Sequence, residues 1–148
     1  MKSLAIVSIF FVLLTTVQTA GAAEWVELGE TVWGTYHYDR ESVRQMGRFV
    51  TVTSKQMLNA RMAASVEAVL PAAKGVAYVV SYELIDCEEG LYQQNSVVYY
   101  DRHGRVLHDS ALTKKQYREP APRPIPPDTP IGWLAETVCA DEVQEPRK

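Results

Sequence analysis

The sequence predicts an α+β domain: an antiparallel sheet of about six strands, with a carboxy-terminal helix packed on one face and tied to it by a disulfide. Most of the chain after residue 24 consists of short runs rich in Val, Thr and Tyr, separated by glycine-containing turns. One late segment, residues 130–139, has an apolar stripe at helical spacing. The only two cysteines are Cys87, in a predicted strand, and Cys139, at the end of that helix.

Residues 1–23 are predicted to be a signal peptide that is removed. Lys2 gives a basic start, residues 4–14 form an apolar run, and small residues occupy 20–23. This order is typical of a secretory leader, and we expect cleavage after Ala22 or Ala23. The apolar run is shorter than the roughly 20 residues of a spanning helix. With no cysteine near the cleavage site, we expect no lipidation through a thiol and no membrane span in the mature chain.

Residues 24–140 are then expected to form one domain, followed by a polar tail at 141–148. The 148-residue chain has a formal net charge of −3, and loss of Lys2 makes the mature form more acidic. A nucleic-acid partner is not expected, because binding phosphates requires a clustered basic face.

Export also predicts the state of the cysteines. In an oxidising compartment two cysteines indicate one disulfide, Cys87–Cys139. Such a bridge would pin the last helix to a strand. Closing a loop of about 50 residues is worth roughly 4 kcal/mol in the chain-entropy model.

The first half reads as strands and turns. "EWVEL" and "TVWGTYHY" are predicted strands separated by a turn at Gly29–Glu30, and "DRESVRQMG" is predicted to be a polar turn. "RFVTVTSKQML" is a strand with Val50 and Val52 on one face. Residues 59–70 predict a short helix, capped by Asn59 and ended by Pro71, or else an ordered excursion between strands.

The second half predicts a three-stranded meander and the last helix. "VAYVVSYELIDC", "LYQQNSVVYY" and "RVLHDSAL" are joined by short glycine-containing turns. "REPAPRPIPPDTP" is expected to stay out of the sheet as an extended spacer. Asp128 or Thr129 is expected to cap the helix, with Pro130 in its first turn. The apolar stripe of this helix consists of Ile131, Leu134, Ala135 and Val138.

Four segments of the chain resemble the surface-adhesin protein E family of Gram-negative bacteria. They are "YHYDRESVRQMGRFVTV", "YELIDCEEGLYQ", "YYDRHGRVL" and "PPDTPIGWLAETVC". The resemblance covers Trp25 to Cys139 and implies a six-stranded antiparallel sheet with a disulfide-tethered helix. It further implies adhesion to vitronectin, laminin and plasminogen, and a capacity to form homodimers. The family's partner-binding stretch corresponds here to "PAAKGVAYVVSYE", in which Lys74 is the only cation.

No pattern predicts catalysis, a metal or a cofactor. His37, His103 and His108 lack the spacing of zinc ligands. His37, Asp39 and Ser42 are close in sequence, but a triad is defined by geometry. Asp39 and Ser42 are expected instead to bond nearby backbone in a turn.

Aromatic and basic side chains are the candidate partner-binding residues. Tyrosine is enriched at interface hot spots, although cross-strand packing under the helix is expected for Tyr78 and Tyr82. The candidate partner-binding residues are Arg40, Arg44, Lys74, Tyr92 and Tyr99, and further charged or aromatic residues are Arg48, Tyr100, Lys114, Lys115 and Arg118. The sequence therefore predicts a secreted, non-enzymatic binding module, an adhesin for host matrix or serum proteins. The alternative is a periplasmic accessory or enzyme-inhibitor protein.

Overall fold

The structure, a computed structural model, describes residues 22–111 and 121–142. The expected leader, the cluster Lys114, Lys115 and Arg118, and the end of the polar tail therefore lie outside the described residues. The strands are β1 (Trp25–Thr31), β2 (Gly34–Met46), β3 (Phe49–Leu58), β4 (Val76–Asp86), β5 (Leu91–Asp101), β6 (Val106–Asp109) and β7 (Arg123–Pro124). The helices are α1 (Ala60–Val69), the 3₁₀ turn η1 (Pro71–Ala73) and α2 (Pro130–Glu142).

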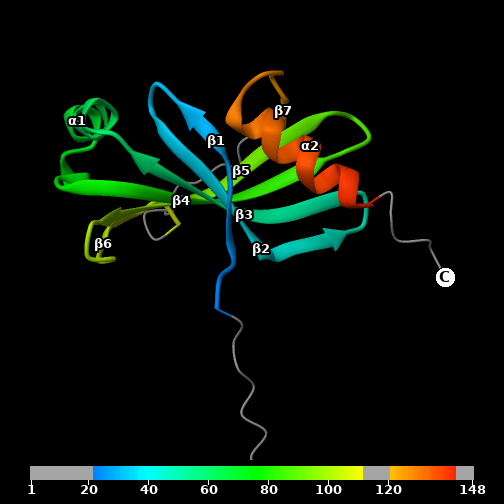
Figure 1. The fold of residues 1–148 in the computed structure, drawn as a ribbon, viewed down its shortest axis with the longest axis horizontal. Helices are drawn as coiled ribbons and strands as arrows, with labels where there is room; N and C mark the ends of the chain where they lie inside the picture. The colour runs from blue at the N-terminus through cyan, green and yellow to red at the C-terminus, as the bar shows by residue number, and fades with distance from the viewer. Residues whose placement is uncertain (1–21, 112–120, 143–148) are drawn as a thin grey trace, which may run out of the picture.

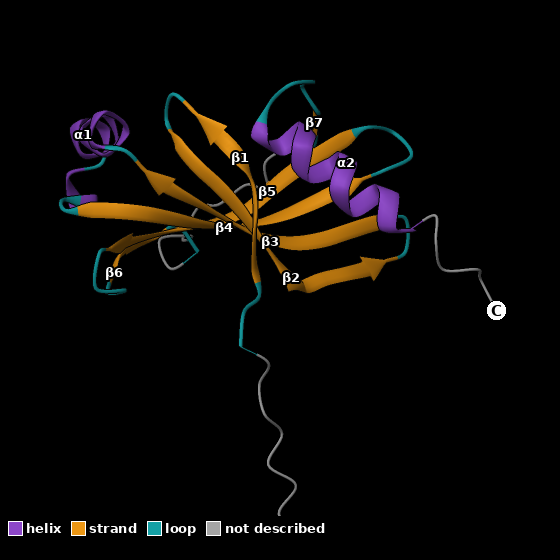
Figure 2. Cartoon of the chain, viewed as in Figure 1, coloured by secondary structure: helices purple, strands orange, loops and turns teal. Residues whose placement is uncertain are grey.

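The strands form one antiparallel sheet in the order β1-β2-β3-β4-β5-β6, and β7 pairs with the start of β5. Helix α2 crosses one face of this sheet, which we call the inner face, while α1 lies at the opposite end of the molecule (Figures 1 and 2). The predicted fold class is confirmed. In the described residues, no helix is both long and apolar enough to cross a membrane.

The core lies between α2 and the inner face. Alternation along β3 places Val50 and Val52 on that face, and Val50 pairs with Ile85 of β4. Leu134 and Val138 of α2 pack against these strand residues, and all five side chains are at most 2 % exposed. Thr129, rather than Asp128, caps α2: its Oγ1 accepts from the backbone N–H of Gly132 at 3.3 Å.

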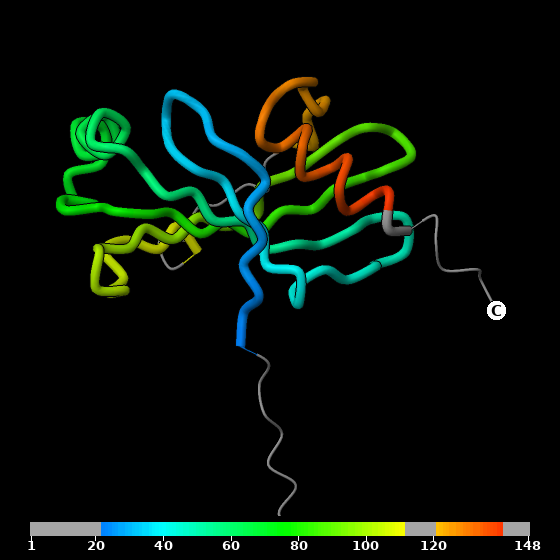
Figure 3. Tube along the Cα trace, viewed as in Figure 1, coloured from blue at the N-terminus to red at the C-terminus, as the bar shows by residue number. Residues whose placement is uncertain are grey.

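The predicted disulfide is present. Cys87 follows β4 directly and is bonded to Cys139 near the end of α2. The trace in Figure 3 shows this end of α2 close to the β2–β3 hairpin. At the β4–β5 turn, Asp86 Oδ1 accepts from the backbone N–H groups of Glu88 and Glu89 at 3.2 and 3.1 Å. The bridge thus joins α2 to a strand end whose turn is also hydrogen-bonded.

Two predicted turns in the first half are wrong. The β1–β2 turn is at Val32–Trp33, and Gly29 lies inside β1, where an added Cβ would be 3.1 Å from the Trp133 ring of α2. The glycine therefore makes room for a helix side chain. Residues 39–47, predicted as a turn, belong mostly to the long β2, whose register against β3 shifts between Asp39 and Arg44.

Asp39 and Ser42 hold this irregular part of β2 in place. Asp39 Oδ1 accepts from the backbone N–H groups of Glu24 and Glu41 at 2.8 and 3.1 Å. The hydroxyl of Ser42 donates to the Asp39 carbonyl at 2.7 Å and accepts from the Thr53 N–H at 2.8 Å. The predicted backbone bonding of both side chains is confirmed, but it occurs at a bulge within a strand.

The tyrosines of β4 do not pack under the helix. Tyr78 pairs with Met57 and Tyr100 in the sheet, its ring stacks on that of Tyr100 with centroids 4.9 Å apart, and Tyr82 is 36 % exposed. Both belong to the outer face, because strand alternation gives the inner face to Ser81, Glu83 and Ile85. The expected cross-strand packing is present for Tyr78, but the expected position of Tyr78 and Tyr82 under α2 is wrong.

The proline-rich segment also departs from expectation. Arg123 and Pro124 pair with Tyr92 and Leu91 of β5, and the Ile125 N–H donates to the Gly90 carbonyl at 2.9 Å. Proline is tolerated in a short edge strand because its missing N–H can face away from the ladder. This pairing places Arg123 beside the inner face.

The predicted first helix is confirmed as α1. The side chain of Asn59 accepts from the backbone N–H of Met62 at 2.9 Å, as an N-cap does. Pro71 follows Leu70 and begins η1, so the α-helix ends where the sequence predicts.

Gly34 is the glycine whose substitution should disturb the sheet most directly. It has a φ of +137°, and an added Cβ would collide with the Met57 carbonyl oxygen on β3. We expect Gly34→Ala to lower the free energy of unfolding by about 2 kcal/mol through backbone strain and overpacking. Urea denaturation would measure this. Gly47→Ala, at φ +64° with open space around it, is the control and should cost about 1 kcal/mol; equal losses would contradict the collision.

Candidate functional site

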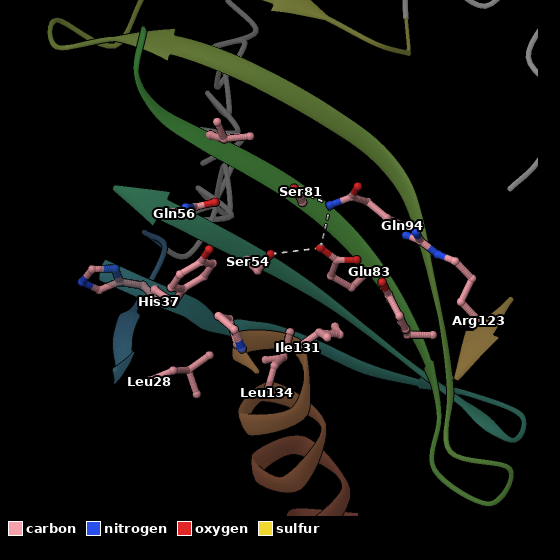
Figure 4. A pocket seen from close by; sticks show the side chains of 14 residues that line it. Leu28, His37, Ser54, Gln56, Ser81, Glu83, Gln94, Arg123, Ile131 and Leu134 are labelled. Atoms are coloured by element: carbon pink, nitrogen blue, oxygen red, sulfur yellow. Dashed lines mark hydrogen bonds between the residues drawn. The ribbon is translucent and has the colours of Figure 1, made fainter. Parts of the chain in front are cut away.

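The inner face carries a cleft of about 230 Å³ beside the first turns of α2. Its lining residues come from β1, β2, β3, β4, β5, β7 and α2 (Figure 4). The apolar part of the lining consists of Leu28, Val79, Pro130, Ile131 and Leu134, and the remaining lining residues are Tyr36, His37, Ser54, Gln56, Ser81, Glu83, Tyr92, Gln94 and Arg123. The cleft thus has an apolar side next to the helix and a polar side on the sheet.

Strand register explains why polar side chains gather here. Ser54 pairs with Ser81, and Val52 pairs with Glu83, so these four residues share the inner face. Toward the disulfide the same face is apolar and α2 covers it, with Val50 and Ile85 beneath the helix. The inner face therefore changes from apolar to polar along β3 and β4, and the cleft lies at the polar end.

Glu83 is the central polar residue of the cleft. It is only 4 % exposed, and its Oε1 accepts from the Ser54 hydroxyl at 3.2 Å and from the Gln94 amide Nε2 at 3.3 Å. Gln94 Nε2 also lies 3.1 Å from the Ser81 hydroxyl. The second oxygen, Oε2, has no partner among the described residues.

Burial dominates the electrostatics of this carboxyl group. Desolvation raises the pKa of Glu83 to about 7, while hydrogen bonds from Gln94 and Ser54 and the positive charge of Arg123 act in the opposite direction. Near neutral pH Glu83 is therefore present in both protonated and ionised forms. A carboxyl group in this state can donate a proton, accept one, or pair with a cation.

Two further lining residues have an unpaired buried nitrogen. These atoms are Gln56 Nε2 and His37 Nδ1, neither of which has a partner among the described residues. The imidazole of His37 points away from Glu83 in Figure 4. Burial raises the pKa of the Tyr36 phenol, and the nearby side chains of Thr31 and Gln56 partly offset this effect. Tyr36 is therefore neutral at physiological pH.

Arg123 supplies the positive charge at the cleft. Its guanidinium lies 4.9 Å from the ring centroid of Tyr92, in the geometry of a cation–π contact, and Figure 4 shows it on the same side as Gln94. The side chain is exposed to solvent, whereas Glu83 is buried. Among the described residues that line the cleft, Arg123 is the one with a permanent positive charge.

The structure does not bring the predicted partner-binding residues into one patch. Tyr92 lines the cleft, whereas Arg40 and Arg44 are exposed on β2, and Arg40 pairs with Glu24 at 3.0 Å. Tyr99 is on β5, three strands from β2 in the sheet order, with its ring centroid 5.9 Å from that of His108. Lys74 is exposed after η1. These positions leave the role of each residue in partner binding as a prediction.

No group of three or more His, Cys, Asp or Glu side chains suited to a metal ion is found in the described part of the chain. Asp39 and Ser42 bond to backbone atoms, so the described contacts do not link them to His37 as a relay.

Sequence reasoning did not identify Glu83, Ser54, Gln56 or Gln94 as site residues. A usable signal was present: "VAYVVSYELID" holds a glutamate within an otherwise mostly apolar strand. A carboxylate at such a position is costly to bury unless it has partners. The sequence does not show which face of this strand is buried, because tyrosines alternate with Ser81 and Glu83 along it.

Comparison with known proteins agrees with the fold. Protein E from non-typeable Haemophilus influenzae is 19% identical with a TM-score of 0.57, over 85% of this chain and 82% of that one. A second structure of Haemophilus influenzae protein E is 19% identical with a TM-score of 0.51, over 76% of this chain and 83% of that one. Crystal form II of the same protein gives 18% identity and a TM-score of 0.50, over 74% and 83%.

The family comparison covers the same region. No curated protein matches the chain. The family model described as surface-adhesin protein E matches residues 25–140, which include every described strand and most of α2. The chain therefore belongs to the surface-adhesin protein E family.

Proposed function

We propose that this chain is an exported, non-enzymatic adhesin domain that binds host extracellular-matrix or serum proteins at the bacterial surface. The family match over residues 25–140 carries the proposal. The match begins at Trp25, just after the expected leader cleavage at Ala22 or Ala23, which supports export of the whole domain. A disulfide between Cys87 and Cys139 also suits an oxidising compartment.

The proposed ligands are vitronectin, laminin and plasminogen, as the family resemblance implies. The test is binding of the purified protein to each of the three, immobilised separately, by surface plasmon resonance. Saturable binding of at least one would support the adhesin function. Absence of binding to all three, from protein whose disulfide and fold are intact by mass spectrometry and circular dichroism, would contradict it.

Location on the cell distinguishes adhesion from the alternative role. Protease added to intact cells should remove a surface adhesin without lysis. Protection until the outer membrane is opened would contradict surface adhesion and favour a periplasmic accessory or inhibitor protein. A periplasmic marker protein followed in the same samples controls for leakage.

The exposed basic residues on β2 are the first candidates whose role in partner binding should be tested. We expect the double substitution Arg40→Ala and Arg44→Ala to weaken binding to an acidic partner surface several-fold, mainly by slowing association, because exposed charges steer encounter. The free energy of unfolding should change little, since exposed ion pairs such as Arg40–Glu24 contribute at most about 1 kcal/mol to it. Arg102→Ala, in the exposed β5–β6 turn, is the control; an equal loss there would argue against a β2 contact.

A further inference from the structure

Glu83 has one carboxyl oxygen that is bonded and one that is not. Ser54 and Gln94 both donate to Oε1, while Oε2 is buried without a partner among the described residues. An unpaired buried acceptor costs free energy, and more so when it is charged. Because Glu83 also lines the cleft of about 230 Å³, a ligand in that space could supply the missing donor once the carboxyl group turns the buried Oε2 toward it.

The lining opposite this carboxyl group suits a short hydrocarbon chain. Leu28 from β1, Val79 from β4, and Ile131 and Leu134 from α2 form the apolar side of the cleft. In Figure 4 the side chains of Leu28, Ile131 and Leu134 lie at the helix end of the site, and Glu83 lies on the sheet. A volume of 230 Å³ is below the usual range for drug-sized ligands, so the occupant must be small.

We propose that this cleft binds a primary alkylammonium group, with the ammonium donating to Glu83 Oε2 and its alkyl chain lying against Leu28, Ile131 and Leu134. The ammonium would satisfy the open acceptor with charge of the opposite sign. The alkyl chain would replace water on the apolar side. Arg40 and Arg44, the residues to be substituted in the adhesion test, do not line this cleft, so the test of amine binding is independent of the test of adhesion.

The bonding of Oε1 favours an ammonium group over a guanidinium. A guanidinium pairs best with both oxygens of a carboxylate through two parallel N–H bonds, but Oε1 already accepts from two donors. An ammonium is a compact charge that can pair with a single open acceptor. An anion would be repelled by ionised Glu83, so the charge of the site also discriminates against carboxylates.

The direct test is calorimetric and NMR titration of the purified protein with n-butylamine at pH 8, where Glu83 is mostly ionised. The other titratable or charged groups lining the cleft are Tyr36, His37, Tyr92 and Arg123. We expect saturable binding with a millimolar Kd and shifts at the side-chain amide of Gln94. Butanol, which has no charge, and butyrate, which has the opposite charge, should each bind at least about tenfold more weakly than butylamine. n-Butylguanidine keeps the positive charge but finds only one unoccupied carboxyl oxygen, so it should also bind more weakly.

Three substitutions make the test specific. Glu83→Gln keeps the shape but removes the charge, and it should weaken butylamine binding at least about tenfold. Glu136→Gln changes an exposed carboxylate on α2 and should leave the Kd unchanged. Arg123→Gln removes the cation that opposes a positively charged ligand, so it should tighten binding several-fold.

The outcomes separate the proposal from nonspecific association. Equal binding of butanol, or an unchanged Kd in Glu83→Gln that retains the wild-type circular dichroism spectrum, would overturn it. Nα-acetyl-L-lysine methylamide distinguishes the sources of the amine. Binding of this compound as tight as that of butylamine would indicate a lysine side chain of a protein as the natural occupant; binding of butylamine alone would indicate a free amine.

Discussion

Cys87→Ser is expected to lower the free energy of unfolding by about 4 kcal/mol, the largest single effect in this protein. The Cys87–Cys139 bridge spans a sequence separation of 52 residues, and a cross-link of that length restricts the unfolded chain by roughly this amount. Domains of this size have total stabilities of about 5–15 kcal/mol. Loss of the bridge would therefore remove a large fraction of the stability and shift the urea midpoint downward.

The bridge also fixes the position of α2. Without it, Leu134 and Val138 still pack against the inner face, so we expect the helix to remain docked but to open more often near Cys139. Hydrogen exchange along α2 would measure this local opening. Cys139→Ser and the double variant serve as controls and should lose the same stability as Cys87→Ser, because all three lack one bond. An unchanged urea midpoint for reduced wild-type protein would contradict the prediction.

Glu83 is expected to make the protein less stable as pH rises from about 4.5 to 7. Burial raises the pKa of Glu83 from 4.5 to about 7 in the folded state, so within this window the folded protein holds a proton that the unfolded chain has released. The free energy of unfolding then falls with pH. One pKa unit corresponds to about 1.4 kcal/mol, so the full change attributable to Glu83 is about 3 kcal/mol.

The comparison that isolates this effect is between wild type and Glu83→Gln. The variant cannot ionise at this position, so its stability advantage over wild type should grow between pH 5 and pH 8, as measured by urea denaturation at each pH. Asp101 acts in the opposite direction at lower pH, because hydrogen bonds from the backbone N–H and side chain of Arg105 and from the His103 N–H lower its pKa. Asp101 is present in both proteins, so its contribution to the pH dependence of stability cancels in the comparison. A difference that does not change with pH would contradict the buried state of Glu83.

Much of the fold was predictable because its signals are local. The α1 cap at Asn59, the α2 stripe of Leu134 and Val138, and the alternation of Val50 and Val52 each depend on residues within a few positions of one another. The disulfide was predictable because the expected export of a chain with two cysteines leaves one pairing. Nothing local identified the cleft, since its lining residues come from seven elements that are far apart in the sequence.

The errors have a common cause in contacts between distant segments. The local sequence around Gly29 indicates a turn, but this glycine is a strand residue that lies against the ring of Trp133, about a hundred positions later in the chain. Residues 39–47 were interpreted as a turn because they are polar, but pairing with β3 extends them as a strand. Arg123 and Pro124 join the sheet although proline disfavours strands.

By itself the sequence determined the fold class, the order of the meander, both helices and the Cys87–Cys139 bridge, since propensity, periodicity and cysteine count act locally or leave a single solution. Only the tertiary structure decided which face of β4 is covered. Residues of β4 point alternately to the two faces, so that one face carries the tyrosines and the other carries the serine, the glutamate and Ile85. Helix α2 packs on the face with Ile85. That choice buries Glu83 beside a cleft, because the side of a sheet on which a helix docks is set by the summed packing of distant residues.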